Sequence, residues 1–247
     1  MADVEKLITE YDRRVAKDMK IAALDKAAKT GVQKIKAAKK IAEITGRTVA
    51  DVLISDLVEL YPDGIIPEEE AKALIVPALD HNYKTVSPYA ERAQIALNRE
   101  NGIGLKTVVP EFDMNRAVGI AVEIANADGI AEDLITNQII NNSINVVDDS
   151  TRANASAQSR AGLTVRVIRR YDGRGLDGGK IACKWCLERA GEWEYSDAVA
   201  RGVFERHTGC ECDLYYKTTK GQWQRQNGSG WDNVSEDVIE ARKRHGR

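Results

Sequence analysis

The sequence has no long apolar run and almost no net charge. None of its hydrophobic stretches approaches the roughly 18 consecutive residues that a membrane-spanning helix needs. The first residues, MADVEKLITEYDRR, carry charges where a secretory signal peptide is apolar. The 36 basic and 38 acidic side chains leave a net charge of −2, so no global field favours a nucleic acid or a membrane surface. We therefore expect a chain that is made in the cytoplasm and has no membrane partner.

The first 160 residues also lack a catalytic set. His81 is their only histidine, and its sequence neighbours supply no metal partner or nucleophile. Gly102 and Gly104 lack the other residues of either nucleotide-binding fingerprint. No repeat of solenoid period is present. Common signatures of nucleotide-dependent enzymes and of solenoid proteins are therefore missing from this stretch.

Residue types are distributed unevenly along the 247 residues. Net charge is +4 over residues 1–46, −10 over 47–159 and +4 over 160–247. All five prolines lie between positions 62 and 110, whereas all four cysteines and all four tryptophans lie between positions 183 and 231. A chain of this length fits one large domain or two small ones. We expect an α+β fold, in which a mostly α-helical region over 1–160, available for protein contacts, precedes a small zinc-stapled α+β domain over 161–247.

Apolar residues recur at helical spacing through most of the first region. The pattern predicts a helix over 3–45 that Gly31 interrupts, and a short helix that begins with Thr48 as its N-cap. Pro67 opens a further helix, which Pro77 ends or kinks. The remaining helices are predicted to start at Ser87-Pro88 and to cover 113–125 and 132–147.

Three polar features of the first region are open to two interpretations each. Residues 148–161 (DDSTRANASAQSRA) fit either a linker or a helix held by packing. The asparagines at 137, 141, 142 and 145 are expected on a solvent-exposed surface that makes no specific contact. The alternative is a polar helix face that forms hydrogen bonds with another group. A basic run is interpreted as a solvated helix face, with phosphate contact as the alternative. The run consists of Lys26, Lys29, Lys34, Lys36, Lys39 and Lys40.

The second region begins with a clear strand over 163–171. This stretch is rich in β-branched residues, and Val165 and Val167 face one way, with Arg169 at the next position of the same face. Glycines mark several turns further along. The other expected elements are a flexible loop at 173–179, a strand at 213–216, a short strand among the turns after Gly221 and a charged terminal helix over 235–242.

The cysteines form the most specific pattern of the chain. Cys183 and Cys186 make a C-x2-C pair, and after 20 intervening residues comes a cluster of His207, Cys210 and Cys212. C-x2-C spacing puts two thiolates on one side of a tight turn, as a tetrahedral ion requires. Zinc prefers such sulfur and nitrogen ligands. We predict one structural zinc ion per chain, with these five residues as candidates for its four ligand positions.

Three other interpretations of the cysteines compete with a metal site. Two disulfides would suit a secreted protein. A redox C-x2-C would need a thioredoxin-like setting and would leave two cysteines unexplained, and free buried thiols are the third alternative. Zinc is favoured because it could contribute on the order of 10 kcal/mol to the folding of this glycine-rich region. A catalytic ion is not expected, since the deaminase and H-E-x-x-H patterns are absent, although Glu188, Glu205 and Glu211 are near in sequence.

The order of these elements resembles the C-terminal domain of the minor head proteins of tailed phages, the Mu F-like class. The resemblance covers about residues 151–216, from a small polar helix with Arg152 and Asn154 through the strand VRVIRR to the cysteine cluster. Many relatives carry a proline after the histidine, where this chain has Thr208. The matching motif positions are Cys183, Trp185, Cys186, Gly191, Phe204, Arg206, His207, Cys210, Cys212 and Tyr216.

The resemblance implies a structural virion protein and not an enzyme. Such a minor capsid protein is made in the bacterial host cytoplasm, is located in the virion head and acts in head morphogenesis or in DNA packaging and delivery. Its expected partners are the phage portal or major capsid protein, in an oligomeric virion context. A zinc-stapled nucleic-acid-binding module is the alternative function, and a metal-dependent hydrolase is less favoured. Packaged DNA is a further candidate partner of the basic tail, through Arg242, Lys243, Arg244 and Arg247.

Overall fold

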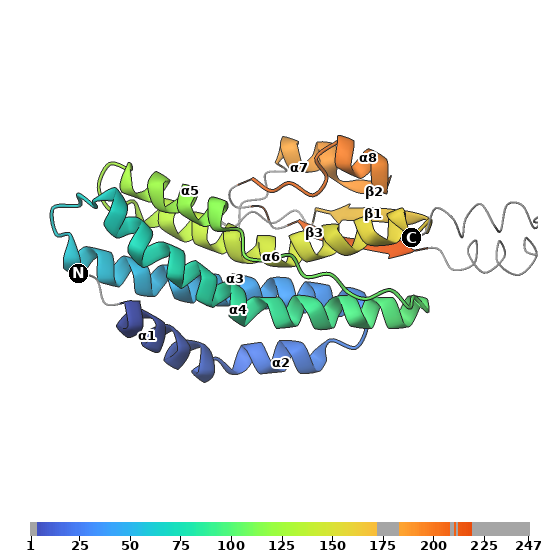
Figure 1. Cartoon of the computed structure of the whole chain (residues 1–247), viewed down its shortest axis with the longest axis horizontal. Coiled ribbons are helices and arrows are strands. Elements are labelled where there is room, and N and C mark those ends of the chain that lie inside the picture. The colour runs from blue at the N-terminus through green and yellow to red at the C-terminus, as the bar shows by residue number, and fades with distance from the viewer. Residues whose placement is uncertain (1–3, 172–182, 208–209, 211, 219–247) are drawn as a thin grey trace, which may run out of the picture.

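The computed structural model confirms an α+β protein in which long helices precede a small sheet (Figure 1). It describes residues 4–171, 183–207, 210 and 212–218. Within these residues, no helix is both long and apolar enough to cross a membrane. The expected loop at 173–179, strand after Gly221 and terminal helix all lie outside the described residues. The helices of the first region are α1 (Val4–Lys17), α2 (Met19–Ala27), α3 (Gly31–Leu60), α4 (Glu68–Asn101), α5 (Met114–Ala125) and α6 (Glu132–Arg160).

Helix α3 corrects the prediction of a separate short helix that begins at Thr48. The helix runs unbroken from Gly31 to Leu60, and the Thr48 hydroxyl donates to the carbonyl oxygen of Ile44 at 3.0 Å instead of capping a new N-terminus. The cap of α3 is Thr30, whose side chain accepts a hydrogen bond from the backbone of Gln33, while the Gln33 side chain bonds back to the Thr30 backbone. This capping box explains the interruption expected at Gly31.

Helix α4 runs through both prolines, so Pro77 does not end a helix and Ser87-Pro88 does not begin one. Pro77 and Pro88 both lie inside its 34 residues. A proline removes one backbone donor from a helix, but apolar packing supports α4 on both sides of these positions. Leu74, Leu79 and Val86 are all buried. Tertiary packing therefore outweighs the local cost of the prolines.

Residues 148–161 continue α6 rather than forming a linker. Several of their polar side chains are buried and paired with other elements, since Asn154 is 2% exposed and Gln158 is 1% exposed. The Asn154 amide accepts from Val108 N at 3.0 Å and donates to Val108 O at 2.6 Å. Asn142 is also buried, which corrects its assignment to the surface. Asn154 and Gln158 are therefore interior contacts of α6, whereas Arg152 and Arg160 of the same stretch are exposed.

The sheet has the order β2–β1–β3, with both pairs antiparallel. In its register, Val167 of β1 lies opposite Trp193 of β2 and Tyr216 of β3. The predicted strands at 163–171 and 213–216 are confirmed, whereas β2 was missed. The bounds are β1 (Val165–Arg170), α7 (Lys184–Arg189), β2 (Gly191–Glu194), α8 (Tyr195–Ala200) and β3 (Asp213–Thr218).

Secondary structure changes after Arg160, but the sheet and the long helices share one apolar core. Ile35 of α3, Leu97 of α4 and Val147 of α6 belong to the same buried cluster as Val167 and Tyr216 of the sheet. Figure 1 shows the sheet between α6 on one side and the short helices α7 and α8 on the other. A second apolar cluster lies among α1, α3, α4, α5 and α6. The sheet is therefore built onto the helical bundle.

Candidate metal centre

The five predicted ligands come from two short segments that the sheet brings together. Cys183 is the N-cap residue of α7, and Cys186 lies in the first turn of that helix. His207, Cys210 and Cys212 lie between α8 and β3. The cysteines form a small cluster of their own, in which Cys186, Cys210 and Cys212 are almost fully buried. The structure therefore places the C-x2-C pair against the second half of the pattern.

The candidate ligand atoms are at distances that a metal ion can bridge. His207 Nε2 is 3.3 Å from Cys183 Sγ and 2.9 Å from Cys186 Sγ, and Cys186 Sγ is 3.7 Å from Cys210 Sγ. Two groups, Cys183–Cys186–His207 and Cys186–Cys210–Cys212, each have all ligand atoms within 4.8 Å of one another. Cys186 belongs to both groups. It is therefore the central member of the cluster.

These residues fit a metal ion by donor type, and one pair of thiols also has the spacing of a tetrahedral site. Two thiolates on a tetrahedral ion with metal–sulfur bonds of about 2.3 Å lie about 3.8 Å apart, which matches the 3.7 Å between Cys186 Sγ and Cys210 Sγ. All four cysteines are free, so none of them forms a disulfide. An ion bound to Cys186 can draw its other ligands from both groups. The cluster could therefore hold a metal with four of the five residues.

Hydrogen bonds and nearby charges favour a thiolate at Cys210. A hydrogen bond from Cys212, helped by the charges of Arg206 and Arg169 and opposed by burial, lowers the pKa of Cys210 to about 4. Burial raises the pKa of Cys186 to about 11, and the hydrogen bond to Cys210 raises the pKa of Cys212. These shifts favour an anionic ligand at Cys210 beside the thiols of Cys186 and Cys212, which would lose their protons on binding a metal.

The side chain of Arg169 in β1 contacts the cluster directly. Its side chain is 2% exposed, and its guanidinium donates to Cys210 Sγ at 3.1 Å and to the carbonyl oxygens of Val203 and Glu205. The same guanidinium lies over the Trp185 ring, 4.9 Å from the ring centre. Sequence patterning placed Arg169 on the inward face with Val165 and Val167, and the structure explains this buried charge by its contacts with the cluster.

Arg206 connects the cluster to α6. Its guanidinium pairs with both carboxylate oxygens of Asp148, and it donates to the carbonyl oxygens of Cys210 and Cys212, each at 3.0 Å. The two charged side chains are only 3% and 4% exposed. Burial alone would lower the pKa of Arg206, but the charge and the hydrogen bonds of Asp148, together with the charges of Cys210 and Cys212, raise that pKa. Sequence reasoning recognised Arg206 as a motif position but missed Asp148, its partner.

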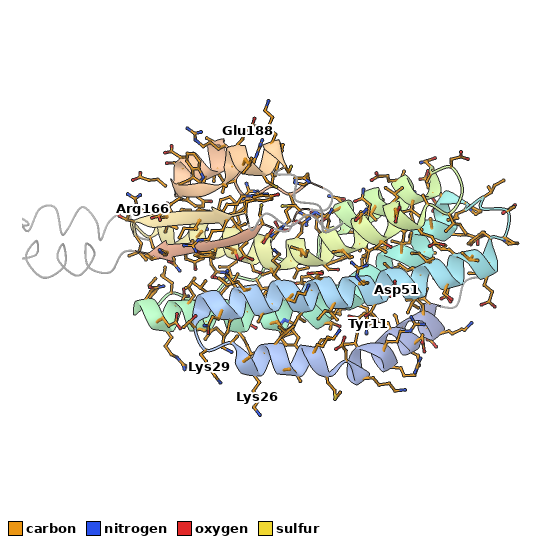
Figure 2. All side chains as sticks on the ribbon, turned by 180° about the vertical axis from the view of Figure 1, so that it is seen from behind. Tyr11, Lys26, Lys29, Asp51, Arg166 and Glu188 are labelled. Carbon is orange, nitrogen blue, oxygen red and sulfur yellow. The ribbon has the colours of Figure 1, made fainter. Side chains whose placement is uncertain are left out.

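The basic run of α3 has a role that neither interpretation of the sequence anticipated. Lys36 and Lys39 pair with Asp213 at 2.6 Å and 3.5 Å, and Lys39 also donates to the carbonyl oxygen of Cys212 at 3.1 Å. These two lysines therefore attach β3 and the cluster to the helical bundle. By contrast, Lys26 and Lys29 are exposed at the outer side of the bundle, where Figure 2 shows their side chains.

Comparison with family models, with curated proteins and with solved structures gives no match. The interpretation of the cluster therefore depends on its own geometry and on the motif order.

Trp185 is packed at the cluster, as a structural tryptophan would be. Its ring meets the His207 ring edge-on, with 5.1 Å between centres, and Arg189 lies over its face at 3.9 Å. Trp193 packs against the core that the sheet shares with the bundle, with Arg201 over its ring at 4.3 Å. Both rings are half-buried against other groups of the chain, whereas Trp223 and Trp231 lie outside the described residues.

The acids named beside the cluster are turned to other contacts. Glu188 is exposed on α7, where Figure 2 shows it at the outer surface, and it pairs with Arg189 at 3.8 Å. The Glu205 carboxylate is exposed and faces Gly202, while Glu211 lies outside the described residues. Of these acids, the two that the structure describes therefore make contacts other than with the candidate ligands.

Proposed function

We propose that this chain is a structural component of a tailed-phage head, in which one zinc ion holds the sheet region together. The metal site is proposed because the side chains of Cys183 and Cys186 lie close to those of His207 and Cys210 beside α7. The phage part rests on the order of motif residues over about 151–216.

Zinc is the ion that this donor set suits best. Thiolate and imidazole ligands select zinc among the abundant divalent ions, whereas magnesium and calcium require oxygen ligands. The cluster is buried and braced by two guanidinium groups, which suits a structural site whose ligand positions are all filled. Cys186 and Cys210 are ligands in this proposal, together with Cys183 and with His207 or Cys212.

The helical bundle would provide the contacts with other head proteins. Helices α3, α4 and α6 run alongside one another (Figure 1), and their outer faces are rich in charged residues. The proposed partners are the portal and the major capsid protein. A minor head component would be present in few copies and would act in head assembly or in DNA packaging and delivery.

Virions provide the test of the phage part. If the gene lies next to a portal gene, particles produced from that phage or prophage should contain this chain, and deletion of the gene should reduce the yield of infectious particles. Mass spectrometry of gradient-purified heads measures the first, and plaque counts with complementation measure the second. Heads that lack the chain and a deletion with normal yield would contradict the proposal.

Nucleic-acid binding is the second candidate function. Exposed Lys26 and Lys29 favour it, but Lys36 and Lys39 of the same run are used within the chain. A mobility-shift assay with duplex DNA decides this point, because phosphate contacts are strongest at low salt. A shift at low salt that disappears as salt rises would support DNA binding, and no shift at low salt would exclude it.

A further inference from the structure

The segment between α8 and β3 carries three of the five candidate ligands, yet charged contacts attach it to helices far away in sequence. Arg206 in this segment pairs with Asp148 of α6. Lys39 of α3 donates to the carbonyl oxygen of Cys212. Both attachments end at the residues that would bind the ion.

We propose that metal binding and the docking of this segment on the helical bundle are linked through the Arg206–Asp148 pair. In this proposal, which rests on the proposed metal centre, Asp148 is a positioning residue that never touches the ion. Outer contacts of this kind orient ligands, and their loss typically costs 10- to 100-fold in metal affinity.

Arg206 is well placed for this role because a single guanidinium holds two ligand residues and one helix. Four contacts use its nitrogen atoms: two with Asp148 and one with each carbonyl oxygen of Cys210 and Cys212. Its NH1 is also 3.6 Å from Cys210 Sγ. The planar, five-donor group is suited to such simultaneous contacts. The backbone on both sides of position 211 is thereby held at a set distance from α6.

Removal of the Asp148 charge would disturb this arrangement more than the loss of an exposed ion pair would. Both side chains are almost fully buried, and a buried charge without its partner is costly. Arg206 would then turn away from α6 toward solvent or another acceptor. The carbonyl oxygens of Cys210 and Cys212 would lose their shared donor, and the ligand atoms would no longer be held in place.

Asp149 offers a matched control on the same helix. It is the next residue, it also pairs with an arginine, and its bond to Arg116 NH1 is 2.9 Å long. However, both partners of this pair are about one-third exposed, and Arg116 lies on α5. Asp149→Asn therefore removes the same charge from α6 without touching the cluster.

The experiment measures zinc affinity of the full chain by competition with a chromogenic chelator. We expect Asp148→Asn to raise the zinc dissociation constant 10- to 100-fold, and Asp149→Asn to change it by less than about threefold. The visible spectrum of the cobalt-loaded Asp148→Asn chain should keep its thiolate bands, because the ligands themselves are unchanged. If Asp148→Asn does not fold, Lys39→Met provides a second variant, with a smaller expected loss of affinity.

Because such a linkage is reciprocal, removal of the metal should weaken the contacts that attach the ligand segment to the helical bundle. Hydrogen exchange after chelation should accelerate in β3 and in the part of α6 around Asp148, and should stay unchanged in the apolar cluster around Leu7 and Leu57. Equal affinities of Asp148→Asn, Asp149→Asn and the parent chain would overturn the linkage and leave the metal centre standing. A parent chain that binds no zinc would instead overturn the metal centre.

Discussion

Gly46 of α3 lies in close contact with α6. A Cβ atom at this position would come within 2.6 Å of Ser143 Oγ, 2.9 Å of Ser143 Cβ and 3.1 Å of Ile140 Cα. Ser143 cannot turn aside freely, because its hydroxyl donates to Ile139 O at 2.8 Å and accepts from Asn82 Nδ2 at 2.6 Å. Gly46→Ala must therefore push the two helices apart or break these hydrogen bonds.

The expected cost of Gly46→Ala is the difference between a local gain and a packing loss. Alanine is favoured over glycine inside a helix by about 1 kcal/mol. Overpacking costs about 1–3 kcal/mol, and one lost buried hydrogen bond adds about 1 kcal/mol. We expect Gly46→Ala to lower the free energy of unfolding by about 1–3 kcal/mol.

Gly119 of α5 provides the control, since it is inside a helix and nothing lies within 4 Å of the Cβ it would carry. Gly119→Ala should raise the free energy of unfolding by about 0.5–1 kcal/mol. Urea unfolding followed by far-UV circular dichroism measures both variants. Equal stabilisation by the two substitutions would refute the close approach of α3 and α6 at Gly46, and with it the packing that places Lys39 and Asp148 beside the cluster.

Two further predictions concern the cluster and a buried tyrosine. Cys186→Ser should abolish stoichiometric zinc binding, because Cys186 belongs to both ligand groups. The same variant should speed hydrogen exchange in the sheet far more than in α1. Equal acceleration in the sheet and in α1 would contradict a stabilising role of the metal that is confined to the sheet. Burial raises the pKa of Tyr11 to about 12, whereas the same hydroxyl ionises near pH 10 in the unfolded chain. The contribution of Tyr11 to stability is therefore fully present below pH 10 and is lost as pH rises toward 12. Tyr11→Phe leaves Asn82 Oδ1 without its donor, so the variant should be less stable than the parent chain by about 1–2 kcal/mol at pH 8. Urea midpoints should show a smaller difference in stability at pH 11, and a larger difference there would contradict the raised pKa.

The positions of the helices and several of their ends, such as both ends of α5 and the starts of α4 and α6, could be read from the sequence, but some boundaries were misplaced. Thr48 and Pro77 carry local signals of a helix boundary, and both lie inside long helices because buried packing outweighs those signals. Residues 148–161 have too few apolar side chains for a periodic pattern. Asn154 and Gln158 are interior because their partners come from distant segments.

The candidate ligands could be found from spacing alone, whereas their supports could not. Cysteine and histidine at these intervals are typical of a metal site. Asp148, by contrast, is one acid among 38 in the chain, and nothing near it in sequence indicates a buried partner 58 residues away. The one local signal was Arg169, a charged residue on the apolar face of a strand.

Metal analysis of the full chain tests the central claim most directly. Protein purified without added metal should contain about one zinc ion per chain, and the native protein should react slowly with thiol reagents until a chelator is added. Protein that contains no metal, with four cysteines that react with thiol reagents in the native state, would contradict a structural zinc centre.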